Sequence, residues 1–258
     1  MKQVKKIILL CGKGESSTII YNGLKNEIDF AAVIIENHIE KKILFKRRLK
    51  KLGWLKTIGQ VLFILTVPKI LLLFHNKKKQ LIFEQFNLKL SPINSEKVIS
   101  VESVNSSKCL KLLQELKPDL IIVNGTRIIN SKVLDSISAK FINTHVGITP
   151  KYRGVHGGYW AIANGDSRNF GVTIHEIDTG IDTGNVLYQK VLAFSSDDNF
   201  ITYPLIQSAG AIKLILKAVK DFNKGELNPI QSIVTESKLW YHPTLWNYLY
   251  LRVKKGIK

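Results

Sequence analysis

The sequence predicts an α/β fold in which a doubly wound, mostly parallel sheet carries helices on both faces. Short apolar runs alternate with helical patterns, and the first unit joins a run at 6–11 through a turn and a helix to a run at 30–36. Two further apolar runs, at 119–123 and 140–145, are bounded by turn residues, which is typical of buried parallel strands. A chain of 258 residues, 45% of them hydrophobic, can bury one core with an added elaboration.

The first elements read as strand, turn, helix and strand. The run at 6–11 leads into Gly12-Lys13-Gly14-Glu15-Ser16-Ser17, which we interpret as a turn. A short helix is expected over 18–25, and the strand at 30–36 has the sequence Phe-Ala-Ala-Val-Ile-Ile-Glu. This β-α-β opening favours parallel pairing of the two strands.

Residues 41–80 interrupt the sheet pattern with a basic and apolar insertion. Leucine and phenylalanine recur there at helical spacing among lysines and arginines, which indicates one apolar and one basic face. Residues 61–74 are almost wholly apolar but contain Pro68 and Lys69, so the run is too short and too broken to predict a transmembrane helix. We expect two amphipathic or buried helices.

The sheet pattern resumes after the insertion with a strand at 98–101. Ser106 or Ser107 is expected to cap the following helix, which Lys117-Pro118 ends. The later elements follow in order: a strand at 119–123, a turn at 124–127, a helix or helical turn at 129–137, a strand at 140–145, a helix at 157–164, strands at 171–177 and 185–191, a long helix at 203–223, and a tail of short strands or irregular structure from Gly225.

The strand at 140–145 ends in the most informative side chains of the chain. Asn143 and His145 are two residues apart and therefore project side by side, and Asp182 follows in a loop 37 residues after the histidine. A hydrogen-bond donor, a proton acceptor and an orienting carboxylate suit attack on a carbonyl carbon. We expect the carboxylate to raise the pKa of His145 and the imidazole to lower that of Asp182. His175 is expected either to pack in its strand or to contact substrate.

Three motifs in this region resemble a known family. Asn143-Thr144-His145 is followed by Pro150-Lys151-Tyr152-Arg153-Gly154 and then by Asp178-Thr179-Gly180-Ile181-Asp182-Thr183-Gly184. In order and spacing they resemble the 10-formyltetrahydrofolate-dependent formyltransferases, which include methionyl-tRNA formyltransferase, glycinamide ribonucleotide transformylase and sugar N-formyltransferases. The resemblance is dense over residues 119–191, weaker over 1–36 and 98–118, and absent over 41–80. It implies the Rossmann-like formyltransferase fold.

The resemblance also implies roles for particular residues. Asn143, His145 and Asp182 match the family's catalytic residues, and no metal is implied. The family's folate pocket corresponds here to two loops, with 10-formyltetrahydrofolate as the donor. The residues implied for it are Gly125, Arg127, Ile128 and Ile129 in one loop and Asp178, Thr179, Gly180 and Ile181 in the other. Relatives usually read Ser-Leu-Leu-Pro after the histidine, whereas this chain has Gly147-Ile148-Thr149-Pro150, a departure on the substrate side.

The acceptor side is assigned to a second group of residues. Gly12, Lys13 and Gly14 lie at the end of the first strand, where a turn can hold a phosphate, and Tyr152 and Arg153 follow the catalytic strand. The spacing of Gly12, Gly14 and Ser17, with Glu36 ending the second strand, superficially meets a dinucleotide fingerprint, but the third glycine is missing. A phosphate of the acceptor near Lys13 is the interpretation we prefer.

The net charge of +18 is concentrated in the insertion. Residues 40–79 contain twelve Lys or Arg and one acid, a local excess of +11. Such a stretch indicates an anionic partner. Three interpretations stay open: a solvated face over a hydrophobic insertion, an interfacial element on an anionic membrane, and nucleic-acid binding, which we favour least.

The acceptor amine distinguishes three possible functions. We expect N-formylation of an amino sugar, in nucleotide-linked form, for surface polysaccharide synthesis, because the chain lacks the sizeable C-terminal domain of the tRNA enzymes after residue 182. A methionyl-tRNA formyltransferase-like enzyme is the alternative. A non-catalytic homologue that binds membrane or nucleic acid is the third, although the retained Asn143, His145 and Asp182 argue against it.

Organisation and location complete the expectations. Residues 1–200 are expected to form the catalytic domain and 201–258 a C-terminal helix and short tail; no motif specifies an oligomeric state. Cys11 and Cys109 are expected to be buried and reduced. Residues 1–11 do not read as a secretory signal, so we expect a cytoplasmic protein, either free or peripheral at the inner face of the membrane.

Overall fold

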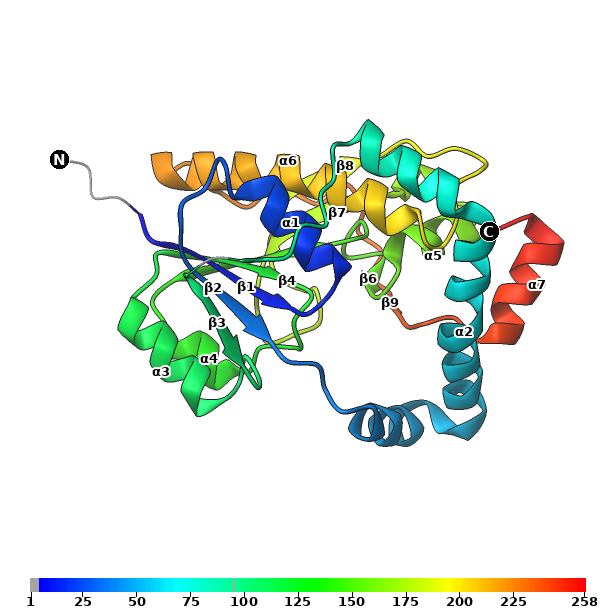
Figure 1. The fold of residues 1–258 in the computed structure, drawn as a ribbon, viewed down its shortest axis with the longest axis horizontal. Helices are drawn as coiled ribbons and strands as arrows, with labels where there is room; N and C mark the ends of the chain where they lie inside the picture. Colours follow the sequence, from blue (N-terminus) through cyan, green and yellow to red (C-terminus); the bar gives the residue numbers. More distant parts are fainter. Residues whose placement is uncertain (1–4, 95) are drawn as a thin grey trace.

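A seven-stranded sheet forms the centre of the computed structural model, which describes residues 5–94 and 96–258 (Figure 1). The strand order is β3-β2-β1-β4-β5-β7-β8. The first five strands in this order are parallel, and β7 and β8 are antiparallel additions at one edge. This confirms the mostly parallel α/β fold. The strands are β1 (Ile7–Gly12), β2 (Phe30–Glu36), β3 (Val98–Val101), β4 (Leu120–Asn124), β5 (Lys140–His145), β7 (Gly171–Glu176) and β8 (Val186–Val191), and a separate pair joins β6 (Arg153–Gly154) to β9 (Leu239–Trp240).

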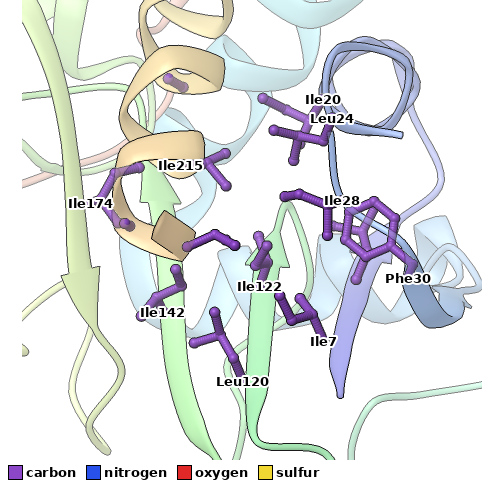
Figure 2. Close-up of a cluster of buried hydrophobic side chains, with 14 of the residues drawn as sticks. Ile7, Ile20, Leu24, Ile28, Phe30, Leu120, Ile122, Ile142, Ile174 and Ile215 are labelled. Atoms are coloured by element: carbon purple, nitrogen blue, oxygen red, sulfur yellow. The ribbon is translucent and has the colours of Figure 1, made fainter. Parts of the chain in front are cut away.

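Helices cover both faces of the sheet. On one face α1 and α6 pack over alternate strand residues such as Leu9 and Ile122, as Figure 2 shows for part of this cluster. On the other face α3 and α4 pack over Ile8 and Ile121. Successive side chains of a strand point to opposite faces of the sheet, so each strand contributes residues to two hydrophobic cores. The helices are α1 (Glu15–Leu24), α2 (Lys41–Gln85), α3 (Ser107–Leu116), α4 (Ser131–Asp135), α5 (Gly157–Ala163), the 3-10 turn η1 (Ser167–Asn169), α6 (Tyr203–Lys224) and α7 (Leu245–Lys255).

The insertion is helical but differs from the prediction of two helices. It is one long element, α2, interrupted by non-helical backbone at Gly53 and His75, so it has three segments. It also continues past residue 80 to Gln85, where Ile82 is buried. The middle segment stands beside α7 (Figure 1). Gly53 permits the first break because its φ of 79° lies in the left-handed region that glycine tolerates.

The tail contains a helix that the sequence reading missed. α7 begins after Thr244, whose side chain accepts a hydrogen bond from the N–H of Asn247, and ends at Gly256 in a left-handed conformation. Tyr248 and Leu251 are buried on one side of this helix. They belong to a third apolar cluster, outside the two sheet faces, which also includes Phe63 of α2. The expectation of short strands or irregular structure was therefore wrong for residues 245–255.

Smaller differences concern boundaries and chemistry. Helix α1 begins at Glu15, three residues before the predicted start, and Ser106 is the cap of α3. Cys11 and Cys109 are both buried free thiols, as expected. The division at residue 200 stays a prediction; α6 itself packs on the sheet. The reading of the N-terminus depended partly on residues 1–4, which lie outside the described residues.

Candidate active site

Two strands bring the predicted catalytic side chains to the carboxyl edge of the sheet. Asn143 and His145 are two residues apart on β5 and project from the same face, as their spacing predicted. The neighbouring strand β7 runs antiparallel and places His175 opposite Asn143 and Thr173 opposite His145. This register adds a second imidazole to the site.

The carboxylate of Asp182 is the centre of the arrangement. Its Oδ2 accepts a hydrogen bond of 2.8 Å from the N–H of Gly154 and lies 3.3 Å from Nδ1 of His145. Its Oδ1 accepts from Nδ2 of Asn143 at 3.3 Å and lies 3.5 Å from Nε2 of His175. Asp182 reaches this position from the loop after β7 with a φ of 50°, a conformation that Asp tolerates better than most residues. The structure therefore brings the three predicted catalytic residues into contact.

The amide of Asn143 is already engaged. Nδ1 of His175 lies 2.7 Å from the carbonyl of Glu176, so that nitrogen carries the hydrogen and Nε2 accepts from Asn143 at 3.1 Å. Both amide hydrogens of Asn143 are thus directed at His175 and Asp182. The predicted role of Asn143 is that of a hydrogen-bond donor, and donation to a substrate oxygen requires that one of these two bonds be exchanged.

His145 is buried between two acceptors. Its Nε2 lies 2.6 Å from the carbonyl of Tyr152, while Nδ1 faces Asp182, so the imidazolium can donate two hydrogen bonds and the neutral ring one. Burial nevertheless lowers the pKa of His145, and the opposing effect of the carboxylate is smaller. The carboxylate therefore raises the pKa of His145 as expected, but burial of a side chain that is only 5% exposed outweighs it and the net shift is downward.

Asp182 titrates in the expected direction. Burial alone would raise its pKa, but the neighbouring His145 and His175 and the N–H of Gly154 reverse this effect. The pKa of Asp182 lies well below its usual range, so the carboxylate is ionised at neutral pH. It acts as a fixed negative charge at the centre of the site.

Tyr152 and Arg153 are placed differently from the substrate-contacting role expected of them. Tyr152 is 1% exposed; its hydroxyl donates to Asp166 at 2.8 Å and its ring stacks on Trp240. Its link to the site is the main-chain carbonyl at His145, which corrects the prediction of a side-chain contact with substrate. Arg153 donates from Nη1 to the carbonyl of Ile181 at 3.0 Å, so it ties the Asp182 loop to β6.

The two loops assigned to the folate lie close together. Ile129 after β4 and Ile177 after β7 belong to the same apolar cluster. Ile128 leaves its side chain 57% exposed on the first loop, which fits contact with a flat aromatic ring. Arg127 pairs with Glu36 through its guanidinium, which also donates from Nη2 to two backbone carbonyls. Its main-chain N–H donates to the same carboxylate, so Arg127 holds the shape of the loop.

The second loop is built around its own turn residues. Oδ1 of Asp178 accepts hydrogen bonds from the N–H of Gly180 at 3.0 Å and from the hydroxyl of Thr183 at 2.7 Å. Asp178 is therefore a turn former in this structure, and Thr179 and Ile181 lie in the turn that it stabilises. The loop thereby presents Asp182, the next residue, to the site.

The turn after β1 has a structural explanation at its first glycine. A Cβ at Gly12 would lie 2.2 Å from the carbonyl oxygen of Gly125, so the ends of β1 and β4 can approach only with glycine there. Lys13 and Gly14 are exposed. The dinucleotide interpretation fails, because Glu36 is buried and accepts from the N–H groups of Val104 and Arg127.

Known proteins resemble this chain in sequence. A family model described as formyl transferase matches residues 66–203. The methionyl-tRNA formyltransferase of Kosmotoga olearia is 34% identical over 131 residues, which are 50% of this chain and 42% of that protein. The enzyme of the same name from Thermodesulfovibrio yellowstonii is 33% identical over 129 residues, again 50% and 42%. The matched segment thus spans less than half the length of these relatives.

Solved structures share the fold over most of the chain. A likely sugar N-formyltransferase from Mycobacterium tuberculosis has a TM-score of 0.55 at 16% identity and covers 92% of this chain and 75% of its own. The Helicobacter canadensis N-formyltransferase, solved with folinic acid and dTDP-3-aminofucose, has a TM-score of 0.55 at 17% identity. The match covers 92% of this chain and 71% of that protein. Phosphoribosylglycinamide formyltransferase from Streptococcus pneumoniae has a TM-score of 0.55 at 21% sequence identity. The match covers 85% of this chain and 99% of that protein.

Proposed function

The chain belongs to the formyl transferase family, and from this premise we propose that it transfers a formyl group from 10-formyltetrahydrofolate to a primary amine. The observation that carries the proposal is the convergence of Asn143, His145 and Asp182 at one carboxylate on the carboxyl edge of the sheet. Ligands of doubly wound sheets bind at this edge. No covalent intermediate with the protein is required.

The proposed mechanism follows from the charges and donors of the site. 10-Formyltetrahydrofolate supplies the formyl group when bound; a bond forms between its carbon and the acceptor nitrogen, and the bond to the folate nitrogen breaks. The acceptor nitrogen loses one proton and the folate nitrogen gains one. The ionised Asp182 stabilises positive charge on the attacking nitrogen, and His145, whose pKa burial lowers, can take up the proton near neutral pH.

Negative charge develops on the formyl oxygen during attack and needs a donor. Asn143 supplies one by exchanging its bond to His175 or to Asp182. His145 supplies another after it takes up a proton, by exchanging its contact with Asp182 or with the carbonyl of Tyr152. One such preorganised donor is typically worth about 10²–10³ in rate.

We infer that the acceptor is an amino sugar in nucleotide-linked form. Sugar N-formyltransferases are among the structures that share the fold over about nine-tenths of the chain, and one was solved with a dTDP-linked amino sugar. The exposed Lys13 at the end of β1 offers a cation to a phosphate of the acceptor. This inference is supported by shared fold and by charge.

A second candidate acceptor is methionyl-tRNA. The curated relatives at about one-third identity carry that name, over half of this chain. A net charge of +18 would favour binding to tRNA. The two candidate acceptors are different molecules, so an assay with each of them distinguishes the two functions.

The test is turnover of 10-formyltetrahydrofolate with each acceptor. Purified protein is incubated with dTDP-linked amino sugars or with methionyl-tRNA, and tetrahydrofolate release is followed by absorbance. Formylation of the sugar amine, verified by a mass increase for one formyl group, would support the proposal. Turnover with methionyl-tRNA alone would show that the acceptor is the tRNA and not an amino sugar. Absence of turnover with every amine would reject the enzyme function.

A further inference from the structure

The middle segment of α2 carries two apolar faces, only one of which is covered. The inner face consists of Gln60, Phe63, Val67 and Leu71, which are buried. Phe63 contacts the rings of Phe200 and Tyr248, at centroid distances of 4.8 and 5.3 Å. This face explains how the helix is attached to the rest of the molecule.

The opposite side of the segment, which we call the outer face, is apolar and open. Its members recur at intervals of three, four or seven residues, which places them on one side of a helix, opposite the inner face. All are more than two-fifths exposed, from 41% at Leu62 to 56% at Leu55. The outer face consists of Leu55, Ile58, Leu62 and Leu65.

Further apolar side chains at both ends of the segment are exposed. Trp54 is 66% exposed at the Gly53 break, and Leu73 and Phe74 are 81% and 79% exposed before the His75 break. The neighbouring α7 adds Val253 at 83%. Contiguous exposure of this kind marks a surface that binds another apolar phase.

Positive charge surrounds the outer face, and within the described residues only Lys78 and Lys79 among the cations of α2 pair with a carboxylate, that of Asp198 and of Glu15. Residues 41–83 contain twelve Lys or Arg and neither Asp nor Glu. The first segment of α2 turns away from the middle segment at Gly53 and carries seven of these cations (Figure 1). At the other end of the chain α7 has Arg252, Lys254 and Lys255 in its last turn.

We propose that α2 and α7 dock on the surface of an anionic lipid bilayer, with the outer face in the interfacial region and the basic residues at the headgroups. Apolar burial and attraction to anionic headgroups act together in such helices. Pairing with a second copy of the chain through the same face would bring two sets of twelve cations together, which opposes association. This inference does not depend on the acceptor.

The helix lies on the bilayer and does not cross it. Within the described residues, α2 is long and apolar enough to span a membrane by length and composition. Its inner face, however, is packed against Phe200 and Tyr248, and the strands before and after it, β2 and β3, are paired in one sheet. Spanning would require these contacts to open.

The test is flotation of the full chain with lipid vesicles. Vesicles of phosphatidylcholine alone are compared with vesicles that also contain phosphatidylglycerol, at low and high salt. We expect binding to the anionic vesicles, weakened by salt, and little binding to neutral ones. Tryptophan emission should shift to shorter wavelength on the anionic vesicles, and this shift should become smaller in Trp54→Phe, which keeps Trp246 of α7.

Matched variants separate a docking face from general attraction of a basic protein. The outer-face variant Leu55→Gln, Leu62→Gln, Leu65→Gln is paired with Leu90→Gln, Ile230→Gln, Ile233→Gln, which are equally exposed elsewhere. The charge variant Lys46→Gln, Arg47→Gln, Lys50→Gln is paired with Lys108→Gln, Lys111→Gln, Lys132→Gln, with the same net change. We expect at least a ~10-fold loss of vesicle affinity in the first member of each pair and less than ~2-fold in the second.

Two results would overturn the proposal. One is absence of flotation with anionic vesicles, or equal binding by both members of a pair in variants whose circular dichroism is native. The other is a dimer of the wild-type chain, measured by light scattering, that the outer-face variant converts to monomer, since a second copy would then cover the face.

Discussion

Asp182 holds the site together at the level of single residues. Its carboxylate contacts Asn143, His145, His175 and the N–H of Gly154, so every proposed catalytic group is positioned against one charge. We expect His145→Ala and Asp182→Asn each to lower kcat by at least about 10²-fold, because proton uptake and stabilisation of the cationic nitrogen are lost.

The measurement is steady-state turnover with the acceptor identified in the assay above. Circular dichroism and thermal unfolding of each variant serve as the control for folding. A variant of either residue that is folded and retains wild-type kcat would remove the proposed mechanism.

Tyr152 gives a prediction that separates positioning from substrate contact. Tyr152→Phe removes the hydroxyl bond to Asp166 but keeps the main-chain carbonyl at His145. We expect kcat and KM to stay within about 3-fold of wild type, while the free energy of unfolding falls by about 1 kcal/mol for the lost hydrogen bond. A large rise in KM with unchanged stability would instead restore the expected contact between the Tyr152 side chain and substrate.

The composition of the site could be predicted from sequence, but its electrostatics could not. The two-residue spacing of Asn143 and His145 on a strand specifies their common direction, and the repeated Asp-Gly turn identifies Asp182. The lowered pKa of His145 depends on burial, and the engagement of Asn143 depends on the register that places His175 beside it. Both are set by tertiary contacts that no local pattern records.

At the level of elements, the junction of β1 and β4 is controlled by a single glycine. We expect Gly12→Ala to lower the free energy of unfolding by about 2 kcal/mol or more, because its Cβ would meet the backbone oxygen of Gly125 at 2.2 Å. Gly14→Ala is the matched control, since nothing lies within 4 Å of a Cβ there. Chemical denaturation measures both; equal stability of the two variants would contradict the close approach.

The elements of the sheet were easier to predict than those outside it. The strands at 30–36, 98–101 and 140–145 have the predicted boundaries. The first of them is a nearly continuous apolar run that ends at Glu36, which is typical of a buried parallel strand. The tail helix α7 was missed although Thr244 and Gly256 are ordinary helix boundaries. Its buried residues pack against α2, which lies about 180 positions earlier in the sequence. The aromatic residues just before the helix made its helical spacing of apolar residues hard to recognise.

At the level of the whole molecule, buried histidines connect separate regions and couple stability to pH. Nε2 of His156, before α5, lies 2.9 Å from Nδ1 of His242 in the tail, so one ring donates and the other accepts. Burial lowers the pKa of His156 well below its ordinary value and that of His242 to about 4. Burial also lowers the pKa of His145 at the active site.

These shifts predict loss of stability in mild acid. An unfolded chain binds a proton at each histidine near pH 6.5, whereas the folded chain resists until about pH 4 at His242. The unfolded state therefore holds more protons in this window, and the free energy of unfolding falls as pH is lowered from about 6.5 to about 4, by on the order of 2 kcal/mol. Carboxylates with lowered pKa, such as Asp182, add to the loss only below about pH 4.

Equilibrium denaturation across this range measures the effect. The double variant His156→Asn, His242→Asn should flatten the pH dependence because it removes two of the titrating groups. His38→Gln, which removes an exposed imidazole, is the control for the loss of a histidine at the surface. A free energy of unfolding that stays constant between pH 6.5 and 4 in the wild-type chain would contradict the burial of these rings, and with it the docking of the tail against α5.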